Sequence, residues 1–134
     1  VYNDIFTYLN THPKEELIIF GSLTDAMAHF ETEVVDYFYT LMKNASNNVR
    51  EIGNDDADTR KYYRRSKKLN PKHEIRLIGE EGRFWQTDDF LYGNTLVIFS
   101  VKKDIFAITI ESEAIVQTYR TLFNMAWRSG KKLT

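Results

Sequence analysis

The feature that most constrains the fold is the last third of the chain. There, alternating apolar residues over 90–110 lead into a helix-like segment that ends at Trp127. Alternation with a period of two is typical of half-buried strands, whereas recurrence every three or four residues is typical of one helix face. Gly93 follows Tyr92, and a glycine at this place favours a two-residue type II′ hairpin before Thr95. A second turn is predicted at 102–104. This order predicts a strand meander sealed by one helix.

The terminal helix has the clearest periodic pattern in the chain. Its apolar residues form one broad face and are Ile115, Val116, Tyr119, Leu122, Phe123, Ala126 and Trp127. Ser112 is placed to cap the start of this helix, and Gly130 with the lysines after it suits the end. We therefore expect Phe123 and Trp127 to be buried against the meander.

The preceding residues alternate between helical and strand patterns. They predict a helix from residue 2 to about 9, a strand over 16–20, a helix over 23–44 with a possible break at 31–33, a strand over 49–52, a helix from the acidic loop 54–58 to 69, a strand over 74–78 and an irregular connection over 79–89. Strands separated by helices imply parallel neighbours, and the meander adds antiparallel ones. The predicted fold class is α/β, with a mixed sheet flanked by helices.

Composition limits the classes of function. The 134 residues are 43% hydrophobic, which is enough for the core of one domain. The net charge of −1 provides no general attraction to nucleic acid or to an anionic membrane, so any such binding must be local. The chain has no cysteine, which excludes disulfides, a thiol nucleophile and a thiolate zinc site. No apolar run approaches the roughly 20 residues that span a bilayer, and we expect a cytoplasmic protein with no membrane partner.

No catalytic residue, metal site or cofactor is predicted. His12, His29 and His73 have no partner at metal-ligand spacing, so surface or packing roles are favoured for them. The acidic pairs 55–56 and 88–89 are interpreted as solvated loop acids, because adjacent carboxylates in loops usually cap helices. No nucleotide-binding or nucleophile-elbow motif occurs in the sequence.

One charge cluster could bind phosphate or nucleic acid. The segment 60–68 contains Arg60, Lys61, Arg64, Arg65, Lys67 and Lys68, with two tyrosines between them. The acidic loop before it should pair with part of this charge, which favours a solvated helix face. The alternative is a nucleic-acid-binding module that uses a basic patch of Arg60, Arg64, Arg65 and Lys68.

Several stretches together resemble the phospholipase-D-like domain of TrmB-type transcription regulators. They are VYNDIFTYL, EELIIFGS, HEIRLIG, FLYGNTLVIFS and FAITIESEAIVQTYRTLFNMAW, and they extend over nearly the whole chain. The resemblance implies one domain over 1–134 with half of a phospholipase-D-like fold. In such regulators a winged helix-turn-helix domain precedes this one and reads DNA. The present sequence is therefore expected to be a fragment that lacks the DNA-binding domain.

The resemblance also implies a function without catalysis. In the related hydrolases the catalytic His and Lys lie on the hairpin that aligns with 90–94, where this chain has Phe-Leu-Tyr-Gly-Asn. We expect a regulatory domain that forms a homodimer and senses a small-molecule effector, with DNA bound only through the absent domain. A degenerate phospholipase-D-like phosphodiesterase is the alternative. Strand ends, and no family motif, suggest Gly21, Ser22, Asn54 and Arg76 as ligand-lining residues.

Overall fold

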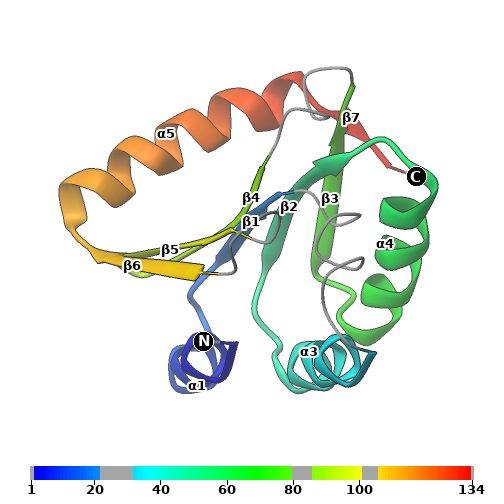
Figure 1. The fold of residues 1–134 in the computed structure, drawn as a ribbon, viewed down its shortest axis with the longest axis horizontal. Helices are drawn as coiled ribbons and strands as arrows, with labels where there is room; N and C mark the ends of the chain where they lie inside the picture. The colour runs from blue at the N-terminus through cyan, green and yellow to red at the C-terminus, as the bar shows by residue number, and fades with distance from the viewer. Residues whose placement is uncertain (1, 22–31, 80–85, 101–105, 134) are drawn as a thin grey trace.

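The computed structural model describes residues 2–21, 32–79, 86–100 and 106–133. These residues form an α/β fold in which helices cover both faces of a mixed seven-stranded sheet (Figure 1). The strand order is β6-β5-β4-β1-β2-β3-β7. The predicted fold class is confirmed.

The described elements follow the predicted order, except that the short final strand β7 was not predicted. The described helices are α1 (Tyr2–Thr11), α3 (Thr32–Asn44), α4 (Ala57–Leu69) and α5 (Glu113–Ser129). The strands are β1 (Leu17–Phe20), β2 (Val49–Asn54), β3 (His73–Ile78), β4 (Thr87–Tyr92), β5 (Thr95–Ser100), β6 (Phe106–Glu111) and β7 (Lys131–Lys132). The predicted helix over 23–44 is described from Thr32 onward, and its first part lies outside the described residues.

The first three strands form the parallel half of the sheet. β1 pairs with β2, and β2 pairs with β3, both in parallel register. Strand β1 is buried along its whole length, as a continuous apolar run between two layers requires. The acidic loop caps α4 as predicted, because the Asp56 side chain accepts a hydrogen bond from the Thr59 amide at 2.8 Å.

The meander pairs as β4-β5-β6 and joins the parallel half through an antiparallel β1-β4 contact. Gly93 has a φ of +53°, and no other described residue has a positive φ. A type I′ turn needs two positive φ values, so the β4-β5 turn agrees with the predicted type II′ hairpin. Tyr92 and Thr95 are paired across it. The predicted turn at 102–104 lies outside the described residues.

Strand β4 begins earlier than predicted. The interpretation of Asp88 and Asp89 as solvated loop acids is wrong, because both lie in β4 and are 9% and 2% exposed. Aspartate is rare in strands, so local preference argued against this assignment. Residues 87–89 are a strand because β4 pairs with the neighbouring strand β1, with Asp89 opposite Phe20. This pairing between distant segments cannot be predicted from local residue preferences.

Each face of the sheet has its own apolar core. The face covered by α1, α3 and α4 buries Ile5, Phe6, Leu9, Leu17, Ile19, Tyr39, Met42, Val49, Tyr62, Phe90, Val97 and Phe99. The opposite face, covered by α5, buries Ile18, Phe20, Ile52, Leu91, Leu96, Val116, Phe123 and Trp127. Strand residues alternate between these two sets, as the pleat requires.

Helix α5 begins and ends as predicted but buries only part of its apolar face. Ser112 accepts a hydrogen bond from the Ile115 amide at 3.2 Å, and Gly130 follows the last turn. Phe123 and Trp127 are buried as expected, whereas Ile115 is 43% and Leu122 is 55% exposed. The helix shares its core with residues of β1, β2, β4 and β5, so the side of its stripe that turns away from these strands stays in solvent. No helix among the described residues is long and apolar enough to cross a membrane.

Candidate functional site

Two of the predicted ligand-lining residues lie together at the carboxyl ends of the parallel strands. The Gly21 amide donates to the Ile52 carbonyl at 3.3 Å, which continues the β1-β2 ladder by one residue. Asn54 is the last residue of β2, so Gly21 and Asn54 lie on neighbouring strand ends. Ser22 lies outside the described residues.

Arg76 has its contacts elsewhere. It lies two residues before the end of β3, and its side chain extends toward the last turn of α5. Its Nη1 donates to the Trp127 carbonyl at 2.7 Å, and its guanidinium lies 4.6 Å from the centre of the Trp127 ring. These contacts hold the end of α5 on the sheet, and they do not bring Arg76 to Gly21 and Asn54.

Two carboxylates that were not predicted as site residues, Asp88 and Asp89, lie beside the carboxyl end of β1. The backbone of Gly21 is so close to Asp88 that a Cβ on residue 21 would lie 2.0 Å from the Asp88 Oδ1 atom and 2.8 Å from its Cα. Glycine at this position therefore allows β4 to approach the end of β1. Neither aspartate was predicted as a site residue, and in the sequence only their position directly before an apolar run distinguishes them.

Asp89 lies on the α5 face of the sheet in a largely apolar environment. It is paired with Phe20, whose ring stacks on the Tyr119 ring with a centroid separation of 5.4 Å. The Tyr119 hydroxyl donates to the Asp89 Oδ2 atom at 3.4 Å. Burial raises the pKa of Asp89 from 3.8 to about 6, although hydrogen bonds from Thr87 and Tyr119 partly offset this effect.

The second oxygen of the Asp89 carboxyl has no hydrogen-bond donor among the described residues. Within the described part of the chain, Oδ1 is buried and accepts no hydrogen bond. A buried carboxylate oxygen normally has a donor, because its desolvation is costly otherwise. This oxygen has the capacity to accept one hydrogen bond, and near pH 6, where part of the carboxyl is protonated, the group can also donate one. The described residues hold no group of three acidic or histidine side chains that could bind a metal ion.

The described histidines have structural contacts. His12 is exposed and stacks on Tyr8 at 4.0 Å between ring centroids. His73 is fully buried, and its Nε2 lies 2.8 Å from the Glu51 Oε2 atom, which also accepts a 2.9 Å hydrogen bond from the Tyr62 hydroxyl. This buried His-Glu-Tyr cluster joins β2, β3 and α4. His29 lies outside the described residues.

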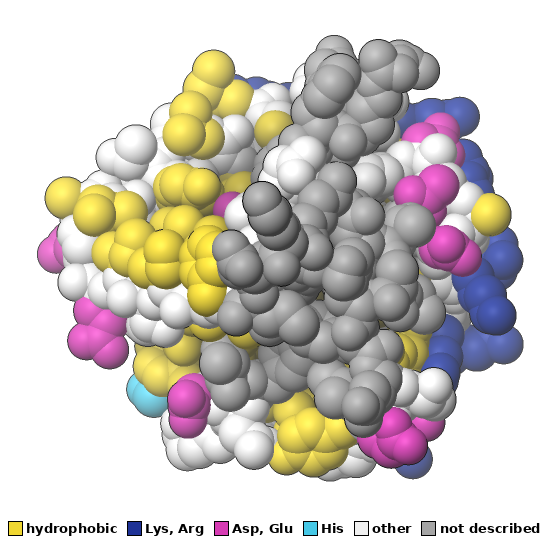
Figure 2. All heavy atoms as spheres, in the orientation of Figure 1, with side chains coloured by type: hydrophobic (Ala, Val, Ile, Leu, Met, Phe, Trp, Pro, Cys, Tyr) yellow, Lys and Arg dark blue, Asp and Glu magenta, His cyan; other side chains and the backbone are white. Residues whose placement is uncertain are grey.

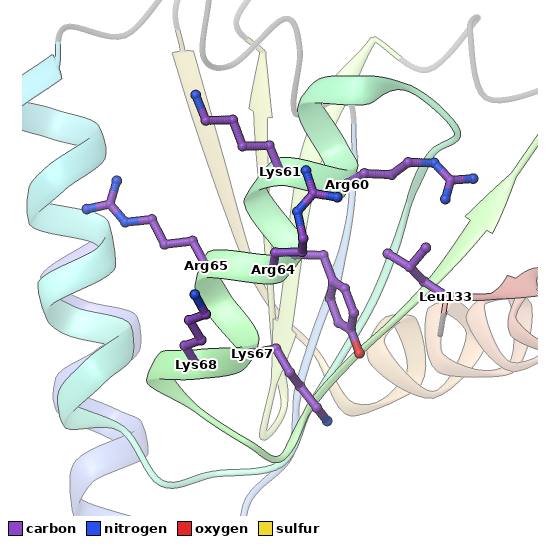
Figure 3. A pocket seen from close by; sticks show the side chains of 8 residues that line it. Arg60, Lys61, Arg64, Arg65, Lys67, Lys68 and Leu133 are labelled. Atoms are coloured by element: carbon purple, nitrogen blue, oxygen red, sulfur yellow. The ribbon is translucent and has the colours of Figure 1, made fainter.

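The basic residues of 60–68 lie on α4, on the outside of the molecule. They line a shallow cavity of about 620 Å³ together with Leu133, which directly follows β7 (Figure 3). Arg60 pairs with Asp55 at 2.7 Å, so the acidic loop compensates part of the charge as predicted. Lysine and arginine side chains gather along the edge of the molecule where α4 lies (Figure 2).

An apolar surface lies on the opposite side of the molecule. Among the described residues, six large apolar side chains are exposed, and five of them belong to β6 and α5: Phe106, Ile108, Ile115, Leu122 and Met125. We call these five the β6-α5 surface. Hydrophobic side chains gather on this side of the molecule in Figure 2. Among the strands that the structure describes, β6 pairs only with β5 and is an edge of the sheet.

Comparison with known proteins identifies a neighbour in fold. No protein-family model matches the chain, and no curated protein matches it. Among solved structures, its fold is similar to that of TrmBL2, an archaeal chromatin protein whose structure shows a novel mode of DNA binding. The TM-score is 0.56 at 12% sequence identity, and the match covers 88% of this chain. The chain spans about half of that protein, because the match covers 45% of its length. At this identity the similarity concerns the fold alone.

Proposed function

We propose that this chain is a regulatory domain of a TrmB-type transcription regulator, that it is cytoplasmic, and that it self-associates through the β6-α5 surface. The observation that carries this proposal is the concentration of exposed apolar side chains on one edge strand and the adjacent helix. Isolated exposed apolar residues are common on monomers, but a group that shares one face indicates a binding site. The fold similarity to TrmBL2, which binds DNA, supports a role in a DNA-binding regulator.

The chemistry of β6 favours a second copy of the chain as the partner. The first five residues of β6, Phe-Ala-Ile-Thr-Ile, contain no charge and no proline. Soluble proteins usually protect edge strands with lysine, proline or a bulge, because an open edge pairs readily with another strand. An antiparallel pair of β6 strands from two copies would satisfy both edges and place the same surface on each subunit, as two-fold symmetry requires.

The oligomeric state tests this proposal. Light scattering after size exclusion should give about twice the monomer mass of 15.8 kDa. Ile108→Lys puts a charge on the apolar edge and should yield monomer. Gln117→Lys, on an exposed position of α5 outside the surface, is the matched control and should stay dimeric. A wild-type monomer at high concentration, or equal behaviour of the two variants, would refute self-association through this surface.

We also infer an effector site at the carboxyl ends of the parallel strands. The buried Asp89 carboxyl, with one oxygen free to accept within the described residues, supports a neutral ligand rich in hydroxyl or amide donors. A thermal-shift screen of neutral hydroxyl- and amide-bearing metabolites should find a compound that raises the melting temperature of the wild type. The shift should disappear in Asp89→Asn but persist in Asp58→Asn, an exposed acid on α4. A shift retained in both variants would place the ligand elsewhere.

The proposed domain is not catalytic. Phe-Leu-Tyr-Gly-Asn at 90–94 provides no imidazole or amine where the related hydrolases carry their catalytic pair. The buried His73 is held by Glu51, and the exposed His12 stacks on Tyr8, which supports structural roles for both. We expect no turnover of bis(p-nitrophenyl) phosphate, with or without a divalent metal. Turnover that is lost on His73→Gln or His12→Gln would establish the alternative phosphodiesterase.

A further inference from the structure

Helix α4 carries a charge that contrasts with the rest of the chain. Its 13 residues contain six Lys or Arg and one acidic residue, Asp58, whereas the whole protein has a net charge of −1. Such local asymmetry marks the kind of surface on which a polyanion can bind despite a neutral whole-molecule field. The strength of such binding depends on how much of this charge is already compensated by other groups of the protein.

Three of the six cations have partners. Arg60 pairs with Asp55, and the Lys67 Nζ atom donates to the carbonyls of Pro71 and His73 at 2.6 and 3.1 Å. Arg65 lies 3.8 Å from the centre of the Tyr39 ring and 3.6 Å from a carboxylate oxygen of Asp36. Both side chains of this last ion pair are more than half exposed, so it neutralises Arg65 only weakly.

The other three cations are uncompensated. Lys61, Arg64 and Lys68 are exposed, and within the described ranges none of them makes an ion pair or a side-chain hydrogen bond. Exposed like charges repel one another only weakly, because water and salt screen them. Their positive charge is nevertheless not neutralised by the described residues, so it is available to an anionic partner.

Their spacing places these cations on one face. Positions 61, 64, 65 and 68 fall within about 100° of arc on a helix with 3.6 residues per turn, and Tyr62 and Ser66 are buried on the other side of α4. We call Lys61, Arg64, Arg65 and Lys68 the α4 cation face. From 61 to 68 the helix rises about 10 Å, the length over which one strand of B-DNA presents about three phosphates.

The C-terminal strand adds a further cation on the same side. Lys131 pairs with Leu77 on β3, and β3 residues at odd positions face α4, because His73 contacts the rings of Tyr62 and Tyr63. Lys131 therefore lies on the α4 side of the sheet and is exposed. Figure 3 shows Leu133, which follows this strand, beside the α4 side chains. The positive surface thus extends from α4 toward the edge of the sheet.

We propose that the α4 cation face binds the phosphate backbone of duplex DNA without reading its sequence. The face is linear and about as long as the axial rise of three phosphates on one strand, which distinguishes it from a pocket for a single anion. Its cations supply position and charge, while sequence recognition would need contacts to base edges. This role does not depend on self-association, because the face lies away from the β6-α5 surface.

Other polyanions fit the surface less well. A membrane-binding helix needs apolar side chains beside its cations for insertion, and on α4 Tyr62 is buried, whereas the exposed apolar residues gather on β6 and α5. Single-stranded nucleic acid is normally held by stacking on exposed aromatic rings. The aromatics of α4 do not provide such a platform, because Tyr62 is 3% exposed and Tyr63 is half-buried.

The experiment measures binding of a fluorescein-labelled 30-base-pair duplex of arbitrary sequence by anisotropy at several salt concentrations. The triple variant Lys61→Ala, Arg64→Ala, Lys68→Ala should lose at least tenfold in affinity at 50 mM salt. Its slope of log K against log salt should fall by about 2 to 3, because each phosphate contact contributes about 0.9. The charge-retaining variant Lys61→Arg, Arg64→Lys, Lys68→Arg should bind as the wild type does.

A matched control tests whether the affinity depends on the cations of α4 or only on the net charge of the protein. Lys14→Ala, Lys43→Ala, Arg128→Ala removes the same charge from exposed positions elsewhere and should keep the affinity within about threefold. Equal losses in the two triple variants would overturn the proposal. Tighter binding to a single strand of the same length, or to vesicles with 30% phosphatidylserine, would overturn it in favour of those partners. No detectable duplex binding by the wild type at 50 mM salt would also refute it.

Discussion

Truncation of Trp127 tests whether α5 seals the fold as the structure indicates. The side chain is 8% exposed and stacks on Phe123 with a centroid separation of 5.7 Å. Two guanidinium groups lie over its ring, that of Arg50 at 5.5 Å and that of Arg76 at 4.6 Å. The ring therefore fills the space between the last turns of α5 and the strands β2 and β3.

The expected cost follows from these contacts. Removal of a buried tryptophan side chain costs about 3–5 kcal/mol, and the two lost cation-π contacts add about 0.5 kcal/mol each, the lower end of the usual range, because the cations are partly solvated. Arg50 is fixed by Glu16 at 2.8 Å and by Asn124 at 3.0 Å, so it cannot readily move into the cavity. Trp127→Ala should therefore lower the free energy of unfolding by about 4–6 kcal/mol, a large share of the roughly 5–15 kcal/mol typical of a domain.

Urea denaturation followed by circular dichroism at 222 nm measures this loss. With a slope of about 2 kcal/mol per molar urea, the midpoint should fall by about 2–3 M, or the variant should be unfolded in buffer. Gln117→Ala on the same helix and Lys132→Ala beyond it are both exposed and should change stability by less than about 0.5 kcal/mol. If Trp127→Ala were as mild as these controls, α5 would not be packed as core.

Three further predictions concern Asp89 and two glycines. Because the pKa of Asp89 is raised to about 6, the folded state binds more protons than the unfolded state between pH 4 and 6, and this group makes the protein less stable as pH rises through that window. The stability of Asp89→Asn relative to wild type should therefore rise by on the order of 2 kcal/mol from pH 4 to pH 7, and a flat difference would contradict the burial of the charge. Gly21→Ala should destabilise by more than about 2 kcal/mol in chemical denaturation, because its Cβ meets the backbone of Asp88, whereas Gly79→Ala has open space and should be nearly neutral. Gly93→Ala should cost about 1–2 kcal/mol in the same assay through its positive φ, and an unchanged midpoint would argue against the type II′ turn.

Local chemistry was sufficient to predict most elements. The Ser112 and Asp56 caps, the Gly93 turn and the end of α4 before Pro71 each depend on residues within a few positions of one another. Such interactions can be read from sequence because the chain itself brings the groups together. The buried run of β1 likewise indicated a strand covered on both faces.

The candidate site depended on contacts between distant segments. Gly21 and Asn54 were predicted to meet because parallel strands share their carboxyl edge, but the approach of Asp88 and Asp89 requires β4 to insert beside β1. Arg76 lies near the carboxyl end of β3, which is why it was predicted to line a ligand site. In the structure its side chain instead donates a hydrogen bond to the Trp127 carbonyl at the end of α5. Pairing of strands that are about 70 residues apart is set by the global packing of the sheet and leaves no local pattern.

The sequence by itself determined the order and type of the elements except β7 and the start of β4, the mixed sheet and the amphipathic nature of α4 and α5, because periodicity and capping are local properties. Only the tertiary structure decided which part of each amphipathic face is used. Val116 and Phe123 are buried while Leu122 is exposed, although all three belong to one stripe of α5. On α4, the sequence predicted that the acidic loop would pair with part of the charge. The structure decided that the paired residue is Arg60, whereas Arg64 has no ion pair within the described residues. Burial and charge compensation depend on which surfaces meet in three dimensions, and this is a property of the assembled layers.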